Sequence, residues 1–587
     1  MFSDAPAPID LSPADGESAF RFGVSEVTFS DGTKVSLPES GVLLLVGPNN
    51  AGKSAALRDA VALITVRPRD RSPTRAVTAV EVSRDGTAED FQAWLEANAF
   101  SVQRAEGPAR KVLYYQRPSA NQNWNALRQE WDSETETFPN AASFFVFYAS
   151  AEQRLGLVGE AGTYDPMTEA PSQPLQALFA NPELEQSLST TCFEAFGTGL
   201  TLARVWGSNL RLHLGETSEE ATIPASAGYI QALQGMPLLQ EQGDGMRSFM
   251  GLMLAIVTAQ FPIIVVDEPE AFLHPPQARL LGRKLATDTP EGTQVFVATH
   301  DSEILQGLLA PSDASVTVVR LVRDGAVNKT SVLRPEELRE IWKDPLLRYS
   351  NVLDGLFHRG VIVSESDADS RYYSAVLDAQ RERDAEAPHD LLFTQSGGKD
   401  RLPVVIGALR ALDIPVATIA DFDVLRDKQL LKRIVERMGG DWSRFKSDWE
   451  VLSGAAAQLG AAPLLASVKS GIKARLEQEP GPNLSRDAAD AIRTMTKVND
   501  SWTRLKSGGL SMIPQGDASA RAKALVDGLA EIGLFVVDVG ELERWEPDIV
   551  GHGPSWVGAA IQAGRHDSPG STTENFVDRV SGFFDSP

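Results

Sequence analysis

Short apolar runs alternate with amphipathic helical stretches in two separate parts of this chain. Such alternation is typical of parallel sheets whose strands are buried on both faces. In the first part, a hairpin is expected within residues 18–36, around Ser30-Asp31-Gly32, before an apolar strand at Val42–Val46. The later strands predicted there are Pro262–Val266, Gln294–Ala298 and Ser315–Val322, with helices at Phe249–Gln260 and Pro276–Ala286.

The second alternation begins after residues 335–359, which we interpret as connecting helices. Its predicted strands are Gly360–Val363, Leu391–Thr394, Pro415–Ala420 and, much later, Leu534–Asp538; its helices are Ser370–Arg381 and Leu402–Leu412. Residues 426–530 are predicted to be mostly helical, and the tail after about 550 reads as weakly specified because it is rich in Gly, Ser and Asp.

Residues 67–240 lack this regularity. We interpret part of them as an insertion, with candidate strands at Lys111–Tyr115 and Ser143–Tyr148, a helix at Pro182–Phe196, and a hairpin formed by Leu200–Val205 and Leu210–Leu214.

A phosphate-binding loop follows the first apolar strand. Residues Gly47-Pro48-Asn49-Asn50-Ala51-Gly52-Lys53-Ser54 match the pattern GxxxxGK[ST]. Backbone N–H groups of such a loop, including those at Asn49 and Asn50, point at phosphate oxygens at a helix N-terminus. Lys53 is expected to reach the outer phosphates and Ser54 to hold Mg²⁺. The loop predicts binding of a nucleoside triphosphate.

Carboxylates complement this loop at the end of a later strand. Asp267 and Glu268 follow the run Ile263–Val266; Asp267 is expected in the Mg²⁺ shell, and Glu268 is expected to polarise the attacking water. His300 ends the next strand, at the carboxyl edge where open α/β sheets bind ligands.

Together these motifs resemble the ABC-type ATPase superfamily, which includes the SMC, Rad50 and RecF-like proteins. Asp267–Pro275 looks like its extended second motif and His300 like its switch histidine. Gly243–Ser248 resembles a degenerate signature motif without the LSGGQ wording, and Gln153 looks like the Mg²⁺-sensing loop glutamine or an ordinary surface residue.

Composition narrows the class of protein. With 587 residues, three or four domains are expected, and the single cysteine, Cys192, excludes a disulfide framework and fits a cytoplasmic location. The N-terminus shows no signal peptide, and no run reaches the about 18 apolar residues of a membrane span. The net charge of −24 disfavours nucleic acid as a partner without excluding it.

Further carboxylates follow strands of the second alternation. Glu365 follows the strand at 360–363, Asp369 comes four residues later, and Asp421 and Asp423 follow the strand at 415–420. Carboxylates at neighbouring strand ends can converge and bind Mg²⁺ or Mn²⁺. Two such ions can clamp the attacking and leaving oxygens of a phosphodiester.

This pattern resembles the TOPRIM fold of topoisomerases, primases and certain nucleases, although Ser366 stands where that fold has glycine. Gln395–Asp400 resembles its Gly-Gly-Lys turn, and Glu541 or Glu543, after the late strand, is implied to complete the metal site. A late catalytic lysine occurs in one TOPRIM branch; no lysine follows Lys523, so none is assigned.

An ABC-type ATPase followed by TOPRIM is the layout of the OLD (overcoming lysogenization defect) nucleases, which include the large subunit of the Gabija anti-phage system. The resemblance covers 20–66, 240–425 and 530–545. It implies an α/β fold: an ABC-type ATPase domain with a long insertion, followed by a TOPRIM domain that carries a helical insertion. The implied ATPase domain consists of 1–66 and 241–334, with 67–240 as an insertion and ATPase lobe that includes a possible dimerisation region. After connecting helices at 335–359, the implied TOPRIM domain consists of 360–425 and, with the tail, 531–587, and 426–530 is its helical basic insertion.

The helical stretch 426–530 carries clustered basic residues with Trp442, Trp449 and Trp502 nearby. These could guide DNA phosphates, or they could form a solvated face of mixed charge. The basic residues are Arg426, Lys428, Lys432, Arg433, Arg437, Lys469, Lys473, Arg475, Arg493, Lys497, Arg504 and Lys506.

The sequence therefore predicts an ATP-regulated DNA endonuclease that depends on Mg²⁺ or Mn²⁺ at Glu365, Asp369, Asp421 and Asp423. Its expected partners are double-stranded DNA, a second copy of the chain or a higher homo-oligomer, and a separately encoded helicase-like or defence protein; no membrane is expected. The alternative is an SMC/RecF-like ATP-driven clamp or scaffold that binds DNA without cutting it. A topoisomerase is disfavoured, because no tyrosine lies in an identifiable strand-passage module.

Overall fold

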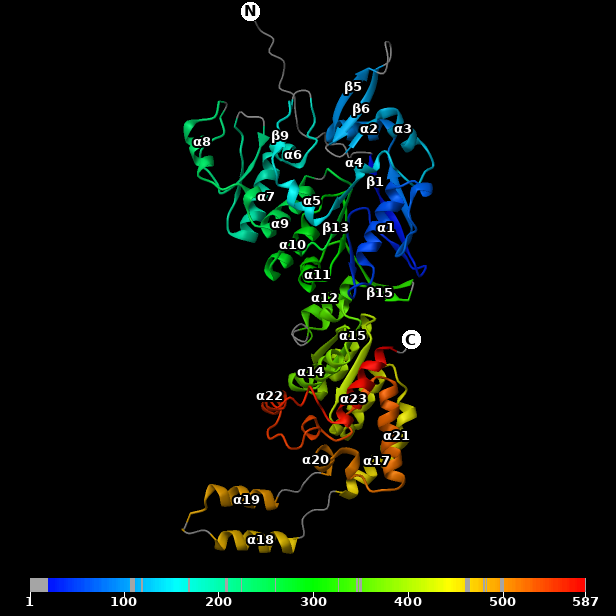
Figure 1. Cartoon of the computed structure of the whole chain (residues 1–587), viewed down its shortest axis with the longest axis vertical. Coiled ribbons are helices and arrows are strands. Elements are labelled where there is room, and N and C mark those ends of the chain that lie inside the picture. Colours follow the sequence, from blue (N-terminus) through cyan, green and yellow to red (C-terminus); the bar gives the residue numbers. More distant parts are fainter. Residues whose placement is uncertain are drawn as a thin grey trace, which may run out of the picture. The chain divides into compact units, whose positions relative to one another are not determined.

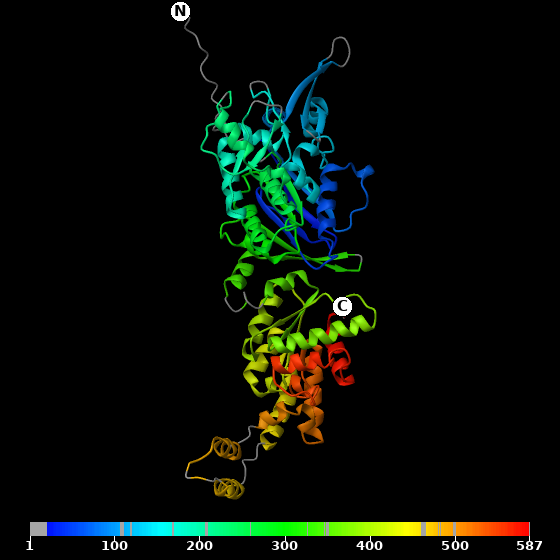
Figure 2. The same ribbon diagram turned by 60° about the vertical axis from the view of Figure 1, so that its left-hand side comes forward.

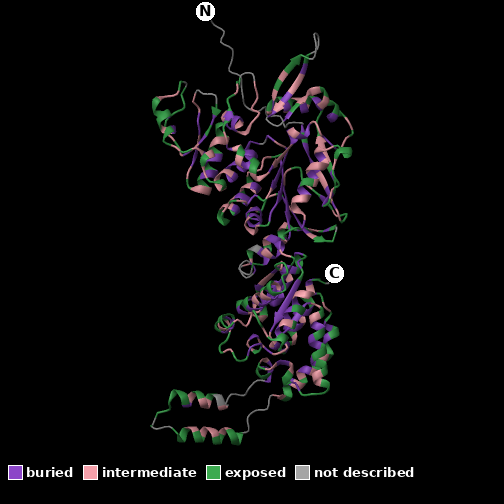
Figure 3. Ribbon diagram, viewed as in Figure 1, coloured by how far each residue is buried: buried purple, intermediate pink, exposed green. Residues whose placement is uncertain are grey.

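Contacts divide the chain into two compact units, Met1–Pro335 (unit 1) and Glu336–Pro587 (unit 2). The structure is a computed structural model, and it describes residues 20–105, 111–117, 120–166, 169–205, 209–222, 224–258, 260–325, 327–344, 347, 351–459, 465–478, 481, 483–496 and 501–585. Each unit has a central sheet flanked by helices (Figures 1 and 2), and the strands of both sheets are largely buried (Figure 3).

Unit 1 contains a six-stranded sheet in the order β16-β15-β3-β14-β13-β8. All neighbours run parallel except β15 and β16, so the carboxyl ends of β3, β14, β13 and β8 lie at one edge. The strands are β3 (Gly41–Val46), β8 (Val146–Ala149), β13 (Ile263–Asp267), β14 (Gln294–Ala298), β15 (Val316–Asp324) and β16 (Val327–Leu333). The helices around this sheet are α1 (Lys53–Thr65), α5 (Ala151–Leu157), α9 (Asp244–Val257), α10 (Pro275–Thr287) and α11 (Ser302–Leu309).

A three-stranded antiparallel sheet, β2-β1-β4, shares one hydrophobic core with α1. Phe22 and Phe145 stack there with ring centroids 4.1 Å apart. The elements of this region are β1 (Arg21–Phe29), β2 (Lys34–Ser36), β4 (Val77–Asp85), α2 (Ala88–Asn98), β5 (Phe100–Ala105), β6 (Lys111–Arg117), β7 (Ala120–Asn123), α3 (Trp124–Asp132) and α4 (Ala142–Phe145). The predicted hairpin around Ser30 is confirmed.

The irregular region 67–240 contributes strands to the sheets described above and also forms elements outside them. It supplies β4 and β8, so much of it belongs to the core; the predicted strand at 143–148 begins as helix α4 and becomes β8 only at Val146. The remainder forms β9 (Ala161–Gly162), α6 (Pro174–Ala180), α7 (Pro182–Phe196), β10 (Leu200–Leu202), β11 (Asn209–Leu210), β12 (Leu212–Leu214) and α8 (Ala227–Gln234). The predicted helix α7 and the β10–β12 hairpin are confirmed.

Unit 2 is built on a parallel sheet in the order β18-β17-β19-β20. Ile362 of β17 joins a core with α14, α22 (Pro554–Gln562) and α23 (Ser571–Gly582), whereas Val361 on the opposite face lies near Leu409 of α15. The elements are α12 (Pro335–Lys343), β17 (Gly360–Ser364), α14 (Asp367–Arg383), β18 (Leu391–Gln395), α15 (Leu402–Ala411), β19 (Val416–Ala420) and β20 (Leu534–Val536).

The predicted helical segment between β19 and β20 is confirmed as α16 (Lys428–Arg437), α17 (Trp442–Leu459), α18 (Leu465–Glu477), α19 (Arg486–Thr496), α20 (Ser501–Lys506) and α21 (Asp517–Glu531). After α20 the backbone packs tightly on the turn that follows β20. A Cβ at Gly509 would lie 1.8 Å from the Asp538 carbonyl oxygen, and one at Gly540 would lie 2.1 Å from the Lys506 carbonyl oxygen. We call this contact of residues 506–510 with 538–540 the glycine seam.

Two regular helices form after residue 550, so the expectation of a weakly specified tail is wrong. They are α22 (Pro554–Gln562) and α23 (Ser571–Gly582). Trp556, Phe576 and Val580 are buried against α14 in the unit 2 core. Glycine and serine between the helices obscured this apolar spacing.

Candidate functional site

The phosphate-binding loop lies between β3 and α1, as predicted. Gly47 has φ +146°, and a Cβ there would lie 2.1 Å from the Leu321 carbonyl oxygen, so the neighbouring strand leaves no room for a side chain. Gly52, with φ +91°, precedes the first residue of α1. Both glycines are therefore required by the backbone path.

Lys53 folds back over this loop. Its Nζ donates hydrogen bonds to the carbonyl oxygens of Gly47 at 2.7 Å and Pro48 at 2.9 Å. Asn49 and Asn50 are exposed at the tip, and Asn50 has φ +62°.

Ser54 and Asp267, 213 positions apart, meet at the edge of the sheet. The Ser54 hydroxyl donates to Asp267 Oδ1 at 3.0 Å, and Tyr148 donates to Oδ2 at 3.4 Å. The two predicted Mg²⁺ ligands of the nucleotide are thus brought together: Ser54 lies in the first turn of α1, which follows β3, and Asp267 ends β13.

Glu268 and His300 lie next to this pair. Glu268 has φ +50°, an uncommon conformation for a non-glycine residue. His300 Nδ1 is 3.8 Å from Glu268 Oε1 and 3.1 Å from Glu270 Oε1, and its backbone N–H donates to the same Glu270 oxygen. Burial raises the pKa of Glu270. Glu270, which the sequence did not single out, therefore positions the predicted switch histidine.

A second residue missed from the sequence is Arg154. It is fully buried, and its guanidinium donates to Ser248 Oγ at 3.1 Å and to the carbonyl oxygens of Asp267 and Glu268 at 3.0 and 3.1 Å. Arg154 thereby links Ser248 of the signature-like segment to the backbone of Asp267 and Glu268. Gln153, its neighbour, is exposed in the first turn of α5, and its proposed sensing role stays a prediction.

The signature-like segment Gly243–Ser248 forms the start of α9. A Cβ at Gly245 would lie 2.5 Å from the Phe272 carbonyl oxygen, so this glycine lets α9 approach the loop after Glu268.

In unit 2 the structure brings together Glu365, Asp421 and Asp423. One carboxylate oxygen from each lies within 4.8 Å of the others. Glu365 follows β17 and Asp421 follows the neighbouring parallel strand β19, and Asp421 N–H donates to Glu365 Oε1 at 3.1 Å. We call these three residues the carboxylate cluster.

Two lysines enter the carboxylate cluster. Lys506 Nζ lies 2.7 Å from Asp421 Oδ2 and 3.8 Å from Asp423 Oδ1, and Lys399 Nζ lies 2.5 Å from Asp423 Oδ2. No lysine follows Lys523, and none was predicted for this site. Lys506, which the sequence placed only in the basic helical segment, reaches the carboxylate cluster from α20.

The carboxylate cluster has the donors that a hard divalent cation requires. Burial raises the pKa of Glu365, and the charges of Asp421 and Asp423 add to this shift; burial likewise raises the pKa of Asp421. Asp423 Oδ1 is buried and accepts no hydrogen bond from the described residues. Oxygen donors crowded in this way fit Mg²⁺ or Mn²⁺.

Asp369, Glu541 and Glu543 lie beyond the cluster. Asp369 caps α14, accepting hydrogen bonds at Oδ2 from Ser366 N at 2.9 Å and Oγ at 2.8 Å; burial and, more weakly, Glu543 raise its pKa. Glu541 and Glu543 form a second group with His552, with one ligand atom of each within 4.8 Å of the others. The predicted ligands therefore fall into more than one group.

The tryptophans of the helical segment belong to the core. Trp442, Trp449 and Trp502 are buried, and the Trp449 indole N–H donates to the Leu425 carbonyl oxygen at 2.8 Å. These three side chains therefore belong to the core of the helical segment and not to a surface that DNA could contact. Lys497 lies outside the described residues.

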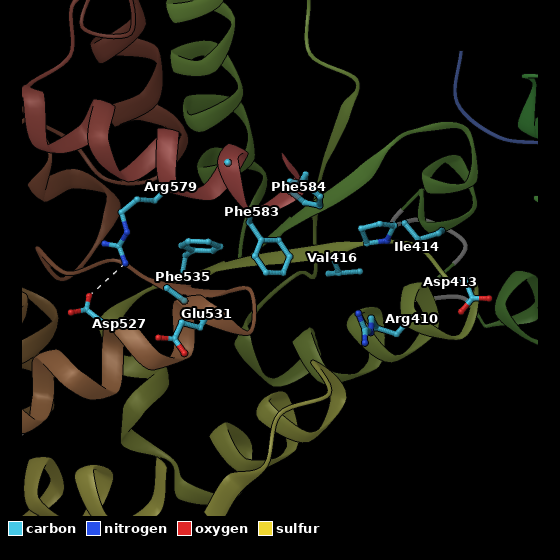
Figure 4. A pocket seen from close by; sticks show the side chains of 13 residues that line it. Arg410, Asp413, Ile414, Val416, Asp527, Glu531, Phe535, Arg579, Phe583 and Phe584 are labelled. Atoms are coloured by element: carbon cyan, nitrogen blue, oxygen red, sulfur yellow. Dashed lines mark ion pairs between the residues drawn. The ribbon is translucent and has the colours of Figure 1, made fainter. Parts of the chain in front are cut away.

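A groove of about 1000 Å³ opens at the other end of β19, where the strand begins. Figure 4 shows Phe535 and Phe583 facing it, with Arg410 on one side and the Arg579–Asp527 ion pair on the other. It contains none of the predicted site residues.

Comparison with known proteins agrees with the nucleotide site. Residues 230–306 match the family model described as "AAA domain, putative AbiEii toxin, Type IV TA system". Unit 1 therefore contains an ATPase domain. No curated protein matches the chain. In the described residues no helix is both long and apolar enough to cross a membrane.

Solved SMC heads are similar to part of the chain. The SmcHead bound to the C-winged helix domain of ScpA is 11% identical over 54% of this chain and 99% of its own, with a TM-score of 0.32. The SMC head domain from Thermotoga maritima is 13% identical over 53% and 99%, with a TM-score of 0.28. TM-scores this low carry no argument about function, so the roles of the site residues are argued from the geometry of the site.

Proposed function

We propose that this protein is a DNA endonuclease that requires a divalent cation and is controlled by ATP in unit 1. One observation carries the proposal: Glu365, Asp421 and Asp423 converge, each half-buried, at the carboxyl ends of adjacent parallel strands. Half-buried carboxylates of like charge repel one another unless a cation offsets their charge, which is why they favour a metal site over a chance grouping.

In this proposal the three carboxylates hold Mg²⁺ or Mn²⁺. A cation bound there supplies water activation and charge stabilisation for phosphodiester hydrolysis. Lys506, beside Asp421, neutralises charge on the DNA phosphate, and Lys399 orients Asp423.

Unit 1 supplies the control. Ser54 and Asp267 hold the Mg²⁺ of ATP, Glu268 positions the attacking water, and His300 contacts the outer phosphate. Unit 2 in this proposal is a TOPRIM domain, and the whole chain is an OLD-type nuclease of anti-phage defence. It acts in the cytoplasm as a homodimer or higher oligomer, with double-stranded DNA and a separately encoded partner.

The test is cleavage of supercoiled plasmid with Mg²⁺ or Mn²⁺, with and without ATP. Asp421→Asn should abolish nicking while ATP binding stays intact. Asp413→Asn, just before the start of the same strand β19, is the matched control and should cut like the wild type. Undiminished cutting by Asp421→Asn would refute the proposal.

One observation favours the alternative of an ATP-driven DNA clamp. Lys506 and Lys399 pair with Asp421 and Asp423, as in an ion-pair network that needs no metal. A clamp predicts a gel shift of DNA without nicking under every metal condition.

A further inference from the structure

Arg154 of α5 binds the two carbonyl groups on either side of the Glu268 Cα. Its guanidinium donates to the Asp267 carbonyl oxygen at 3.0 Å and, from a second nitrogen, to the Glu268 carbonyl oxygen at 3.1 Å. These carbonyls belong to the planar peptide units before and after the Glu268 Cα, so the two hydrogen bonds together hold the φ and ψ angles of Glu268. The rigid fork of N–H groups in a guanidinium suits this paired contact.

The backbone conformation of Glu268 that is held in this way is an uncommon one. Its φ of +50° lies in the left-handed region, which a residue with a Cβ occupies where its surroundings hold it there. The Glu268 backbone N–H donates to the Ala298 carbonyl oxygen at 2.9 Å, and the Glu268 side chain is 59% exposed. Arg154 therefore directs an accessible carboxylate by holding the backbone that carries it.

The same guanidinium contacts the signature-like segment. Arg154 Nε donates to Ser248 Oγ at 3.1 Å, and Ser248, the last residue of that segment, is buried in α9. Arg247 donates to the Leu155 carbonyl oxygen at 3.3 Å, and a Cβ at Gly251 would lie 2.1 Å from the Arg154 carbonyl oxygen. The backbones of α5 and α9 are therefore packed so closely that a displacement of the signature-like segment also displaces Arg154.

We propose that Arg154 is a positioning residue for ATP hydrolysis. It holds Glu268 in the orientation in which this carboxylate positions the attacking water, and it makes that orientation depend on the position of the signature-like segment Gly243–Ser248. The inference rests on the role of Glu268 in the proposed function, but not on DNA cleavage. Lys53 and Ser54 bind the nucleotide from α1, on a different strand–helix connection, so ATP affinity should not depend on Arg154.

Steady-state ATP hydrolysis and ATP affinity of the full chain test this assignment. Arg154→Lys keeps the positive charge but replaces the rigid fork by a single ammonium group. It should lower kcat by about 10²-fold, the effect of a small misplacement of a group that positions a reactant, and leave the Kd for ATP unchanged. Arg283→Lys, the same substitution at a half-exposed residue of α10, is the control and should hydrolyse ATP like the wild type.

Ser248→Ala is a milder variant, which decides the matter if Arg154→Lys does not fold. It removes the hydroxyl that links Arg154 to the signature-like segment and leaves the two carbonyl contacts in place. Loss of one hydrogen bond to a charged group should lower kcat by about tenfold, again with unchanged ATP affinity. A wild-type kcat in Ser248→Ala would contradict the link between the signature-like segment and Glu268.

Combination with Glu268→Gln distinguishes positioning from support of the fold. Because Arg154 acts through Glu268, adding Arg154→Lys should not lower the residual turnover of the Glu268→Gln protein any further. The inference would be overturned if the double variant lost the same factor again, or if Arg154→Lys alone had a wild-type kcat. Normal turnover of Glu268→Gln alone would instead refute the role of Glu268 in the proposed function, so the two failures can be told apart.

Discussion

The glycine seam provides a sharp test of how Lys506 reaches the carboxylate cluster. An alanine at Gly540 would place its Cβ 2.1 Å from the Lys506 carbonyl oxygen, on a backbone with φ +117°. Overpacking costs about 1–3 kcal/mol and such a backbone conformation about 1–3 kcal/mol more for a residue with a side chain. Gly540→Ala should therefore destabilise unit 2 and displace Lys506 from Asp421.

Even the lower end of this range, about 2 kcal/mol in total, lowers Tm by about 4–8 °C for a unit of this size. Thermal unfolding measures the loss, and hydrogen exchange over residues 501–512 should show faster exchange. The matched control is Gly454→Ala in α17, where an added Cβ meets no atom within 4 Å among the described residues. That variant should gain about 0.5–1 kcal/mol, as expected for replacing a helical glycine.

The ATPase rate of unit 1 should be the same in both variants. If Gly540→Ala had the Tm of the wild type and the same hydrogen exchange over residues 501–512, the idea that the glycine seam positions Lys506 would be refuted.

Three further predictions concern single side chains. Glu268→Gln should keep ATP binding but lower hydrolysis by about 10²–10⁴-fold, measured by phosphate release, because the attacking water loses its base; normal turnover would contradict the role of Glu268. Lys506→Met should reduce plasmid nicking by at least about tenfold with ATPase activity unchanged, because the charge beside Asp421 is lost; Lys446→Met, on the same helical segment, should have no effect. Trp556→Ala should cost about 3–5 kcal/mol in chemical denaturation, since this fully buried ring fills the unit 2 core; a cost below about 1 kcal/mol would contradict the structure of the tail.

Features encoded in short local patterns were predictable. The loop Gly47–Ser54 and the strand ends at Asp267, Glu365 and Asp421 follow from apolar runs that finish in polar residues. Within each sheet, parallel pairing then brings the strand ends to one edge without further information, which is why the contact of Ser54 with Asp267 in unit 1 could be expected.

Features that depend on burial and long-range packing were not predictable. Arg154 reads as an ordinary helix residue until its guanidinium is found enclosed by three acceptors. Lys506 is one of many basic residues in the helical segment, and nothing in the sequence distinguishes it as the one whose side chain reaches the carboxylate cluster. Trp449 stands among basic residues in the sequence, yet it fills a core, because apolar contact area and DNA affinity favour the same aromatic side chains.

The late helices α22 and α23 also affect when the protein becomes competent during synthesis. The strands of unit 1 all lie before residue 334, so its sheet can form while later residues are still being translated. The unit 2 core needs Phe576 and Val580 to cover α14, more than 200 residues after β17 has been made. A nascent chain can therefore complete the sheet that carries the nucleotide site well before the core behind the carboxylate cluster is filled, so under the proposed function the control element forms before the cleavage site does.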